Sequence, residues 1–216
     1  PAERAGLIPT RAWKFGATGV RWQGGEDMVA GIGQGFVQCT PLQLATMCAR
    51  IANGGYGVTP HLTRDQLADG RMNERPAAPP PAIGVSAEHL AVVARGMFNV
   101  VNSPNGTAFA NRITDKTMMM AGKSGTAAVK RLTDEERKRK IDQIPWKERD
   151  NALFIAFAPF DNPRYACSIV IEHSQQGGST VAAPIARDLL AAAITHGRQP
   201  PLSATALRLA SADIPR

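Results

Sequence analysis

The stretch Ala121-Gly-Lys-Ser-Gly-Thr-Ala127 lies just past the middle of this 216-residue chain. It combines a cation, two hydroxyls and two glycines, and we predict a strand over residues 117–129. A cation and hydroxyls along a strand can hold a carboxylate, and a glycine leaves the strand open to close approach. The backbone of such a strand can pair with an extended peptide, and one of its N–H groups can face a developing oxyanion. The candidate site residues are therefore Lys123, Ser124, Gly125 and Thr126.

Two strands and a helix are predicted to follow this stretch. The continuous apolar run 152–158 is typical of a strand that is covered on both faces. The turn Asp161-Asn-Pro163 leads into a strand over 165–172, and a helix is predicted over 180–194. Because short turns favour antiparallel pairing, we expect an antiparallel sheet with the C-terminal helix on one face.

Two helices are predicted ahead of the stretch. Thr40-Pro41 opens the first as N-cap and first helical residue, and Asn53-Gly54-Gly55 ends it. Ser86 caps the second, whose apolar face is formed by Leu90, Val93, Ala94, Met97 and Val101. Residues 1–40 are predicted to form loops with short extended pieces. The predicted fold class is α+β: an antiparallel sheet with packed helices plus a helical layer.

The composition excludes several classes of protein. Apolar residues make up 44% of the chain, which is enough for a buried core. Three cysteines cannot form a disulfide scaffold, and the sequence has no C-x-x-C pair. The 25 basic and 18 acidic residues give a net charge of +7. Basic and acidic residues are both most concentrated in residues 130–149. There, Thr133 and Glu136 match the capping-box pattern, which predicts a short solvated helix over 133–140 in preference to a nucleic-acid patch.

Three other patterns are set aside. Gly122-Lys-Ser124 is half of a phosphate-binding loop, but Thr117 stands where that loop needs glycine, so nucleotide binding is rejected. Gly31-Ile-Gly-Gln-Gly35 has the wrong spacing for a dinucleotide turn and is predicted to be a tight structural turn. The four histidines show no i, i+4 pairing. We predict no metal and no cofactor.

Several further segments stand in a fixed order around the Lys-Ser-Gly-Thr stretch. They are Ile8-Pro-Thr-Arg-Ala-Trp-Lys14, Gly31-Ile-Gly-Gln-Gly35, Thr40-Pro-Leu-Gln-Leu-Ala45, Ile51-Ala-Asn-Gly-Gly55, Asn151-Ala-Leu-Phe-Ile-Ala-Phe-Ala-Pro159 and Asn162-Pro-Arg-Tyr165. Lys123-Ser-Gly125 itself is the third signature motif of penicillin-recognising serine enzymes. Together these segments resemble the C-terminal part of the class B penicillin-binding proteins, of the penicillin-binding protein 2 type, up to about residue 196.

The resemblance implies an incomplete serine β-lactamase/transpeptidase-like fold and a peptidoglycan D,D-transpeptidase. In that family a serine attacks a D-Ala-D-Ala stem peptide, forms an acyl-enzyme and passes the peptide to an amine, and β-lactams acylate the same serine. By resemblance, Lys123 and Thr126 would be catalytic: Lys123 would support proton transfer, and the Thr126 N–H would form half of the oxyanion hole. Lys123, Ser124, Gly125 and Thr126 would bind the substrate, with the two hydroxyls on its carboxylate.

The chain departs from the family in two of its motifs. No serine has a lysine three residues later, so the nucleophile motif Ser-x-x-Lys does not occur. The second motif, Ser-x-Asn, occurs only as Ser103-Pro-Asn105, which is out of order and is predicted to be a turn. We therefore expect residues 1–197 to be the C-terminal portion of a transpeptidase domain, inactive without an N-terminal part that carries the membrane anchor. Residues 198–216 are expected to form a mobile tail.

The resemblance also implies a location and partners. It places the protein at the periplasmic face of the inner membrane, in cell-wall synthesis and cell shape, with a cell-elongation glycosyltransferase as partner. Two other hypotheses stay open. A non-catalytic module that binds stem peptides or a partner protein is motivated by the absent motifs, and a nucleic-acid binder is motivated by charge alone.

Overall fold

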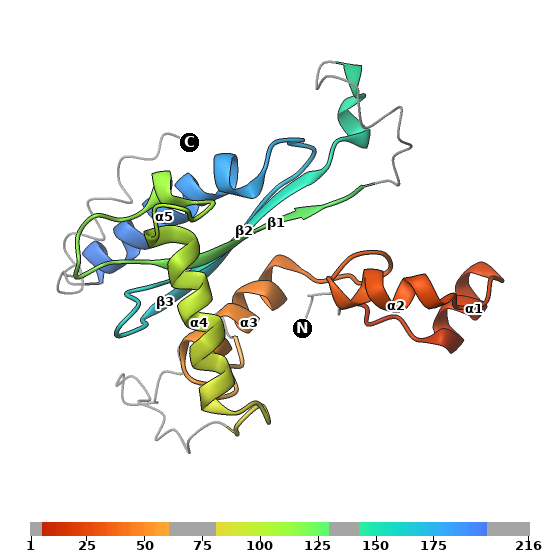
Figure 1. Cartoon of the computed structure of the whole chain (residues 1–216), viewed down its shortest axis with the longest axis horizontal. Helices are drawn as coiled ribbons and strands as arrows, with labels where there is room; N and C mark the ends of the chain where they lie inside the picture. Colours follow the sequence, from red (N-terminus) through yellow and green to blue (C-terminus); the bar gives the residue numbers. More distant parts are fainter. Residues whose placement is uncertain (1–5, 61–80, 130–142, 198–216) are drawn as a thin grey trace, which may run out of the picture.

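The order of helices and strands follows the predicted plan in its second half and departs from it in its first. The computed structural model describes residues 6–60, 81–129 and 143–197. The elements in chain order (Figure 1) are α1 (Arg11–Thr18), α2 (Gly24–Gly31), α3 (Pro41–Ala52), α4 (Ala87–Asn102), η1 (Phe109–Asn111), β1 (Ala121–Ala127), η4 (Trp146–Glu148), β2 (Asn151–Ala158), β3 (Tyr165–Ile171) and α5 (Gly178–His196).

The three strands form one antiparallel sheet in the order β1-β2-β3. Lys123 of β1 lies opposite Ile155 of β2, which in turn lies opposite Ser168 of β3. The second and third strands match the predicted ranges to within a residue. The first is shorter than the predicted 117–129, because a turn that includes the hydrogen bond from Met118 N to Asp115 O occupies its expected start.

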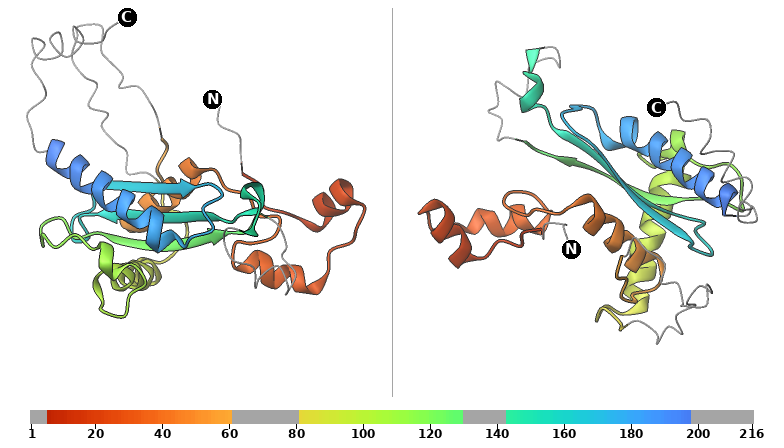
Figure 2. Two further views of the ribbon diagram at one scale, coloured as in Figure 1. Left: turned by 90° about the horizontal axis from the view of Figure 1, so that it is seen from above. Right: turned by 180° about the vertical axis from the view of Figure 1, so that it is seen from behind.

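Helices cover both faces of the sheet, which confirms the predicted α+β fold class. Figure 2 shows α5 on one face and α3 with α4 on the other. On the α5 face, Phe154 is completely buried, and on the opposite face Phe157 packs with Cys48 of α3 and Met97 of α4. This explains why β2 is apolar from Ala152 to Ala158, since burying each such ring stabilises the fold by about 1.5–3 kcal/mol.

The predicted caps of α3 and α4 are confirmed. Thr40 Oγ1 accepts a hydrogen bond from Gln43 N at 3.2 Å, and Thr40 N donates to Gln43 Oε1 at 2.9 Å, which completes a capping box. Ser86 Oγ accepts from His89 N at 3.3 Å. On α4, Val93 is 46% exposed although the periodicity placed it on the buried face, since it lies at the flank of the stripe that Leu90 and Met97 define.

The prediction that residues 1–40 form loops is wrong, because this segment contains α1 and α2. Thr10 Oγ1 caps α1 by accepting from Trp13 N at 3.1 Å. Lys14 of α1 is only 4% exposed, and its Nζ donates to Glu26 Oε2 of α2 at 2.7 Å and to Arg21 O at 2.9 Å. An ion pair between the buried Lys14 and the partly exposed Glu26 thus joins the two helices, and hydrophobic periodicity does not report such a pair. In Figure 1 this α1–α2 arm extends away from the sheet.

Two predictions fall outside the described residues. They concern the helix over 133–140 and the tail over 198–216. Within the ranges that the structure covers, none of the helices is both long and apolar enough to cross a bilayer.

The three cysteines should differ sharply in reactivity. Burial raises the pKa of the Cys48 thiol to about 12 and that of Cys167 to about 11, whereas Cys39 is exposed. The thiolate is the reactive form, so iodoacetamide at pH 8 should modify Cys39 alone in the folded chain and all three residues in urea. Mass spectrometry counts the adducts, and modification of Cys48 or Cys167 in the folded chain would contradict the described core.

The α1–α2 arm should loosen in acid. The hydrogen bond from Lys14 and then that from Gln23 N hold the pKa of Glu26 below its ordinary value of 4.5. Stability from this pair is therefore present above pH 4.5 and is lost as the pH falls further. Amide hydrogen-exchange protection in α1 and α2 should drop between pH 6 and pH 3.5 in the parent. In Glu26→Gln it should already be low at pH 6, and equal pH profiles would refute the role of the pair.

Candidate functional site

The four predicted site residues are consecutive on β1, at the edge of the sheet. Lys123, Gly125 and Thr126 are exposed and Ser124 is half-buried. Among the described strands, β1 pairs with β2 alone. One edge of β1 is therefore without a neighbouring strand at the residues where the sequence predicts a site.

The side chains of these residues alternate between the two faces of the sheet. Ala121 packs with Cys48 and Met97, so the odd-numbered residues of β1, including Lys123, face the α3–α4 layer. A Cβ on Gly122 would meet the Phe154 ring at 2.5 Å, so the even-numbered residues lie on the α5 face. The structure thus keeps the ammonium and the two hydroxyls in one strand but directs them to opposite sides of it.

The backbone groups of Ser124 and Thr126 lie along the unpaired edge of β1. Lys123 Nζ donates to Ser124 O at 2.7 Å, and Gln34 Nε2 donates to Thr126 O at 2.8 Å. In an antiparallel strand, alternate residues direct both N–H and C=O to the same side. Both carbonyls have side-chain partners from outside β2, so we place them, with the N–H groups of the same two residues, on the side away from β2. We call this side the open edge.

Contacts at its start hold β1 in place. Asn102 Nδ2, at the end of α4, donates to Met120 O at 2.9 Å and to Phe98 O at 3.0 Å. The turn after α4 is the one predicted at Ser103-Pro-Asn105, with Gly106 N donating to Ser103 O at 2.8 Å. This segment is therefore a turn that precedes the site strand.

Gly178 brings the first turn of helix α5 into close contact with the backbone of β1 and β2. A Cβ at Gly178 would lie 1.9 Å from Leu153 O and 2.9 Å from Gly125 O, so only glycine allows the first turn of α5 to lie this close to the sheet. The positive end of the helix dipole thereby lies behind Gly125. The predicted helix begins only at Thr180 and omits this contact, although the pair Gly177-Gly178 is a visible signal of it.

The arrangement offers groups that bind an anion and an extended chain. The Lys123 ammonium and the Ser124 and Thr126 hydroxyls are donors for a carboxylate, and the N–H groups on the open edge are donors for an oxyanion. Across residues 6–60, 81–129 and 143–197, no three His, Cys, Asp or Glu side chains gather as metal ligands.

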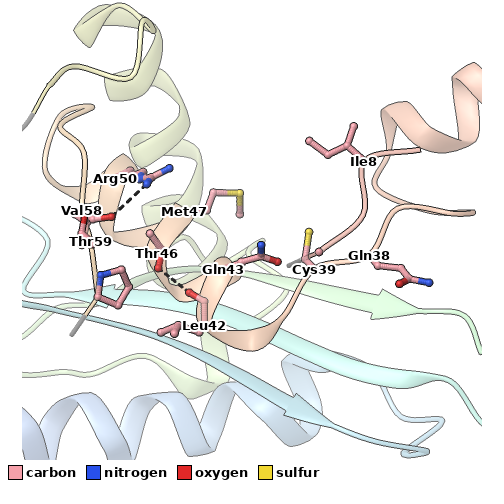
Figure 3. Close-up of a pocket in the computed structure, with 12 residues that line it drawn as sticks. Ile8, Gln38, Cys39, Leu42, Gln43, Thr46, Met47, Arg50, Val58 and Thr59 are labelled. Carbon is pink, nitrogen blue, oxygen red and sulfur yellow. Dashed lines mark hydrogen bonds between the residues drawn. The ribbon is translucent and has the colours of Figure 1, made fainter. Parts of the chain in front are cut away.

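A separate hollow of about 550 Å³ lies along α3 (Figure 3). Its lining includes the exposed side chains of Ile8, Leu42 and Met47, and Arg50, whose Nη2 donates to Val58 O at 3.2 Å. None of the four predicted site residues lines this hollow. The predicted site and this hollow are therefore different places.

A comparison with protein families matches residues 1–191 to the penicillin-binding protein transpeptidase domain. Among curated proteins, the peptidoglycan D,D-transpeptidase MrdA of Haemophilus influenzae is 37% identical over 191 residues, and that of Escherichia coli K12 is 33% identical over 176. These alignments cover 87% and 81% of this chain.

Among solved structures, Pseudomonas aeruginosa PBP2 in complex with WCK 5153 is 37% identical, with a TM-score of 0.67 over 87% of this chain and 38% of that chain. The Helicobacter pylori complex of PBP2 with MreC is 26% identical, with a TM-score of 0.70 over 92% of this chain and 33% of that chain.

The sheet, its two helical layers and the Lys-Ser-Gly-Thr strand define a protein of the serine β-lactamase/transpeptidase-like class. Within that class, the chain belongs to the transpeptidase family of penicillin-binding proteins, and its relatives support the class B, penicillin-binding protein 2 type. The resemblance drawn from the sequence is thus confirmed. The chain spans 29% and 28% of the length of the two curated relatives named above.

The close approach of α5 to β1 can be tested with two adjacent glycines. Gly178→Ala should lower the free energy of unfolding by about 3 kcal/mol, because its methyl group would overlap a backbone oxygen. Gly177→Ala should cost no more than about 1 kcal/mol, because its Cβ would meet only Ser179 Oγ, at 3.9 Å. Urea unfolding measures both, and equal losses would contradict the described contact.

Proposed function

We propose that this chain supplies the substrate-binding strand of a serine-type peptidoglycan D,D-transpeptidase. The observation that carries the proposal is the open edge of β1, where the Lys123 ammonium binds Ser124 O and no described strand pairs with the backbone. A stem peptide that ends in D-Ala-D-Ala is extended and carries a terminal carboxylate. Such a peptide can add to a strand edge while its carboxylate meets cationic and hydroxyl donors.

In the proposed reaction, a serine Oγ attacks the carbonyl carbon between the two D-Ala residues. The serine proton is transferred to the leaving amine, the C–N bond breaks, and terminal D-Ala departs as the acyl-enzyme forms. An amine of a neighbouring stem peptide then attacks the ester, forms an amide and releases the serine. The Thr126 N–H supports the oxyanion in both steps, while Lys123 assists proton transfer and, with Ser124 and Thr126, holds the carboxylate.

The serine and its lysine partner must come from outside these 216 residues, because the sequence contains no Ser-x-x-Lys. We propose that residues 1–197 form the C-terminal portion of the transpeptidase domain, that residues 198–216 form a tail, and that this chain alone is inactive. The proposed location is the periplasmic face of the inner membrane, in the synthesis that maintains cell shape. The proposed partners are a cell-elongation glycosyltransferase and, from the Helicobacter pylori complex, a protein of the MreC kind.

A second candidate function is a non-catalytic module that binds stem peptides or a partner protein. The observation that favours it is again the absence of Ser-x-x-Lys from the 216 residues. In that case the open edge would still bind an extended peptide without acylation. Covalent labelling of a protein that joins this chain to a Ser-x-x-Lys segment separates the two functions.

Fluorescent penicillin should label that longer protein and leave the 216-residue chain unlabelled, because the covalent step needs a serine nucleophile with its base. Electrophoresis with in-gel fluorescence reports the covalent adduct. Boiling before addition of the penicillin is the control for non-specific reaction. Labelling of the 216-residue chain by itself would contradict the proposal.

In the longer protein, Lys123→Ala should lower the second-order acylation rate by about 100-fold or more, since it removes both the ammonium at the carboxylate and a participant in proton transfer. Lys116→Ala is the matched control, because Lys116 is an exposed lysine in the turn before β1. Stopped-flow or gel-based acylation kinetics measure both. A near-normal rate in Lys123→Ala would argue against the role of this lysine.

A further inference from the structure

Two backbone carbonyl oxygens on the open edge already accept hydrogen bonds from side chains. Lys123 Nζ donates to Ser124 O at 2.7 Å, and Gln34 Nε2 donates to Thr126 O at 2.8 Å. The first bond joins adjacent residues, whereas the second joins residues 92 positions apart. Gln34 is therefore brought to β1 by the fold and not by local sequence.

A tight turn presents Gln34 to the strand. Gly33 and Gly35 on either side both have a φ of 74°, which glycine adopts without strain, so the tight structural turn predicted at residues 31–35 is confirmed. Gln34 N donates to Val29 O at 3.0 Å, which ties the turn to the end of α2. The following Phe36 packs edge-on against Trp13 of α1, with ring centroids 5.6 Å apart. The α1–α2 arm thus fixes the turn from two sides.

The bond from Gln34 has the chemistry of a peptide bond from a neighbouring strand. A side-chain carboxamide N–H donates to Thr126 O just as the backbone amide of an added strand would. A peptide that pairs with the open edge needs the same acceptor for its own N–H. Although a carbonyl oxygen can accept two hydrogen bonds, Gln34 approaches Thr126 O from the open edge, where the ligand amide would also lie, so the two donors compete for the same space. A ligand with no N–H at that point does not enter this competition.

We infer that Gln34 is a specificity-determining residue that covers Thr126 O in the ligand-free protein and weakens binding of ligands that bring an amide N–H to it. The inference rests on the proposed function, because it takes the open edge as the ligand site. It assigns the α1–α2 arm a part in ligand selection. The discriminated ligands are β-lactams that carry an acylamino side chain, whose amide supplies the N–H donor, and β-lactams that lack this side chain.

The test uses the longer protein with its Ser-x-x-Lys segment and two penams. One is a penicillin with an acylamino side chain, and the other is the penam nucleus without that side chain. Gln34→Ala and the similarly sized Gln34→Met both remove the donor. Each should raise the acylation rate of the acylamino penicillin by about 2- to 10-fold, the worth of one hydrogen bond, and leave that of the bare penam unchanged.

Gln38→Met is the control, since this exposed glutamine lies in the same segment and its backbone pairs with Leu7. It should leave the ratio of the two rates unchanged. An unchanged ratio in both Gln34 variants, an equal change for both penams, or slower acylation by the acylamino penicillin would overturn the inference. Parent protein that neither penam acylates would instead overturn the proposed function and this inference with it.

The contact itself can be measured in the 216-residue chain. A scalar coupling across the hydrogen bond between the Gln34 side-chain nitrogen and the Thr126 carbonyl carbon is expected in isotope-labelled protein. The coupling should vanish in Gln34→Met, while the backbone amide spectrum of β1 and β2 keeps its dispersion. Its absence from the parent spectrum would overturn the inference independently of the kinetics.

Discussion

The antiparallel pairing of β1 with β2 along a single edge is the constraint on which the rest of this structure depends. It fixes Lys123 opposite Ile155 and Thr126 opposite Ala152. Because helices cover both faces of the sheet, a ligand reaches the backbone of β1 from the side. Unpaired strand edges readily bind extended chains, and here the edge carries a cation and two hydroxyls at the same residues.

Close packing behind β1 makes that edge rigid. Gly122 lies against the Phe154 ring, and Gly178 brings the first turn of α5 against Leu153 O and Gly125 O. At the start of the strand, Asn102 binds Met120 O. Donors that stabilise an oxyanion must already be in position when charge develops, since moving them during the reaction would consume the benefit. A strand held from behind by backbone contacts meets that requirement better than a loop would.

The sequence predicts those parts of the fold that local patterns control. The caps at Thr40 and Ser86 locate α3 and α4, and the apolar run of β2 predicts a strand buried on both faces. The α1–α2 arm is missed because the Lys14–Glu26 pair stabilises it, and a charged pair leaves no apolar period.

The same limit applies to the candidate site. The Lys-Ser-Gly-Thr residues are evident because they are contiguous, so the sequence places all four on one strand. Gln34 was assigned only to a structural turn, since its bond to Thr126 spans 92 residues and no local rule predicts it. Gly178 lies outside the predicted helix over 180–194, because the reason for a glycine there is a contact with a strand 25 residues earlier, at Leu153.

The most direct measurement of the central claim is a crystal structure of the longer protein acylated by a β-lactam. We expect the acyl carbonyl oxygen to lie about 3 Å from the Thr126 N–H. We also expect the ligand carboxylate to contact Lys123, Ser124 or Thr126, and the ligand to run along the open edge of β1. A ligand bound in the hollow along α3, or an acyl oxygen remote from Thr126, would contradict the central claim.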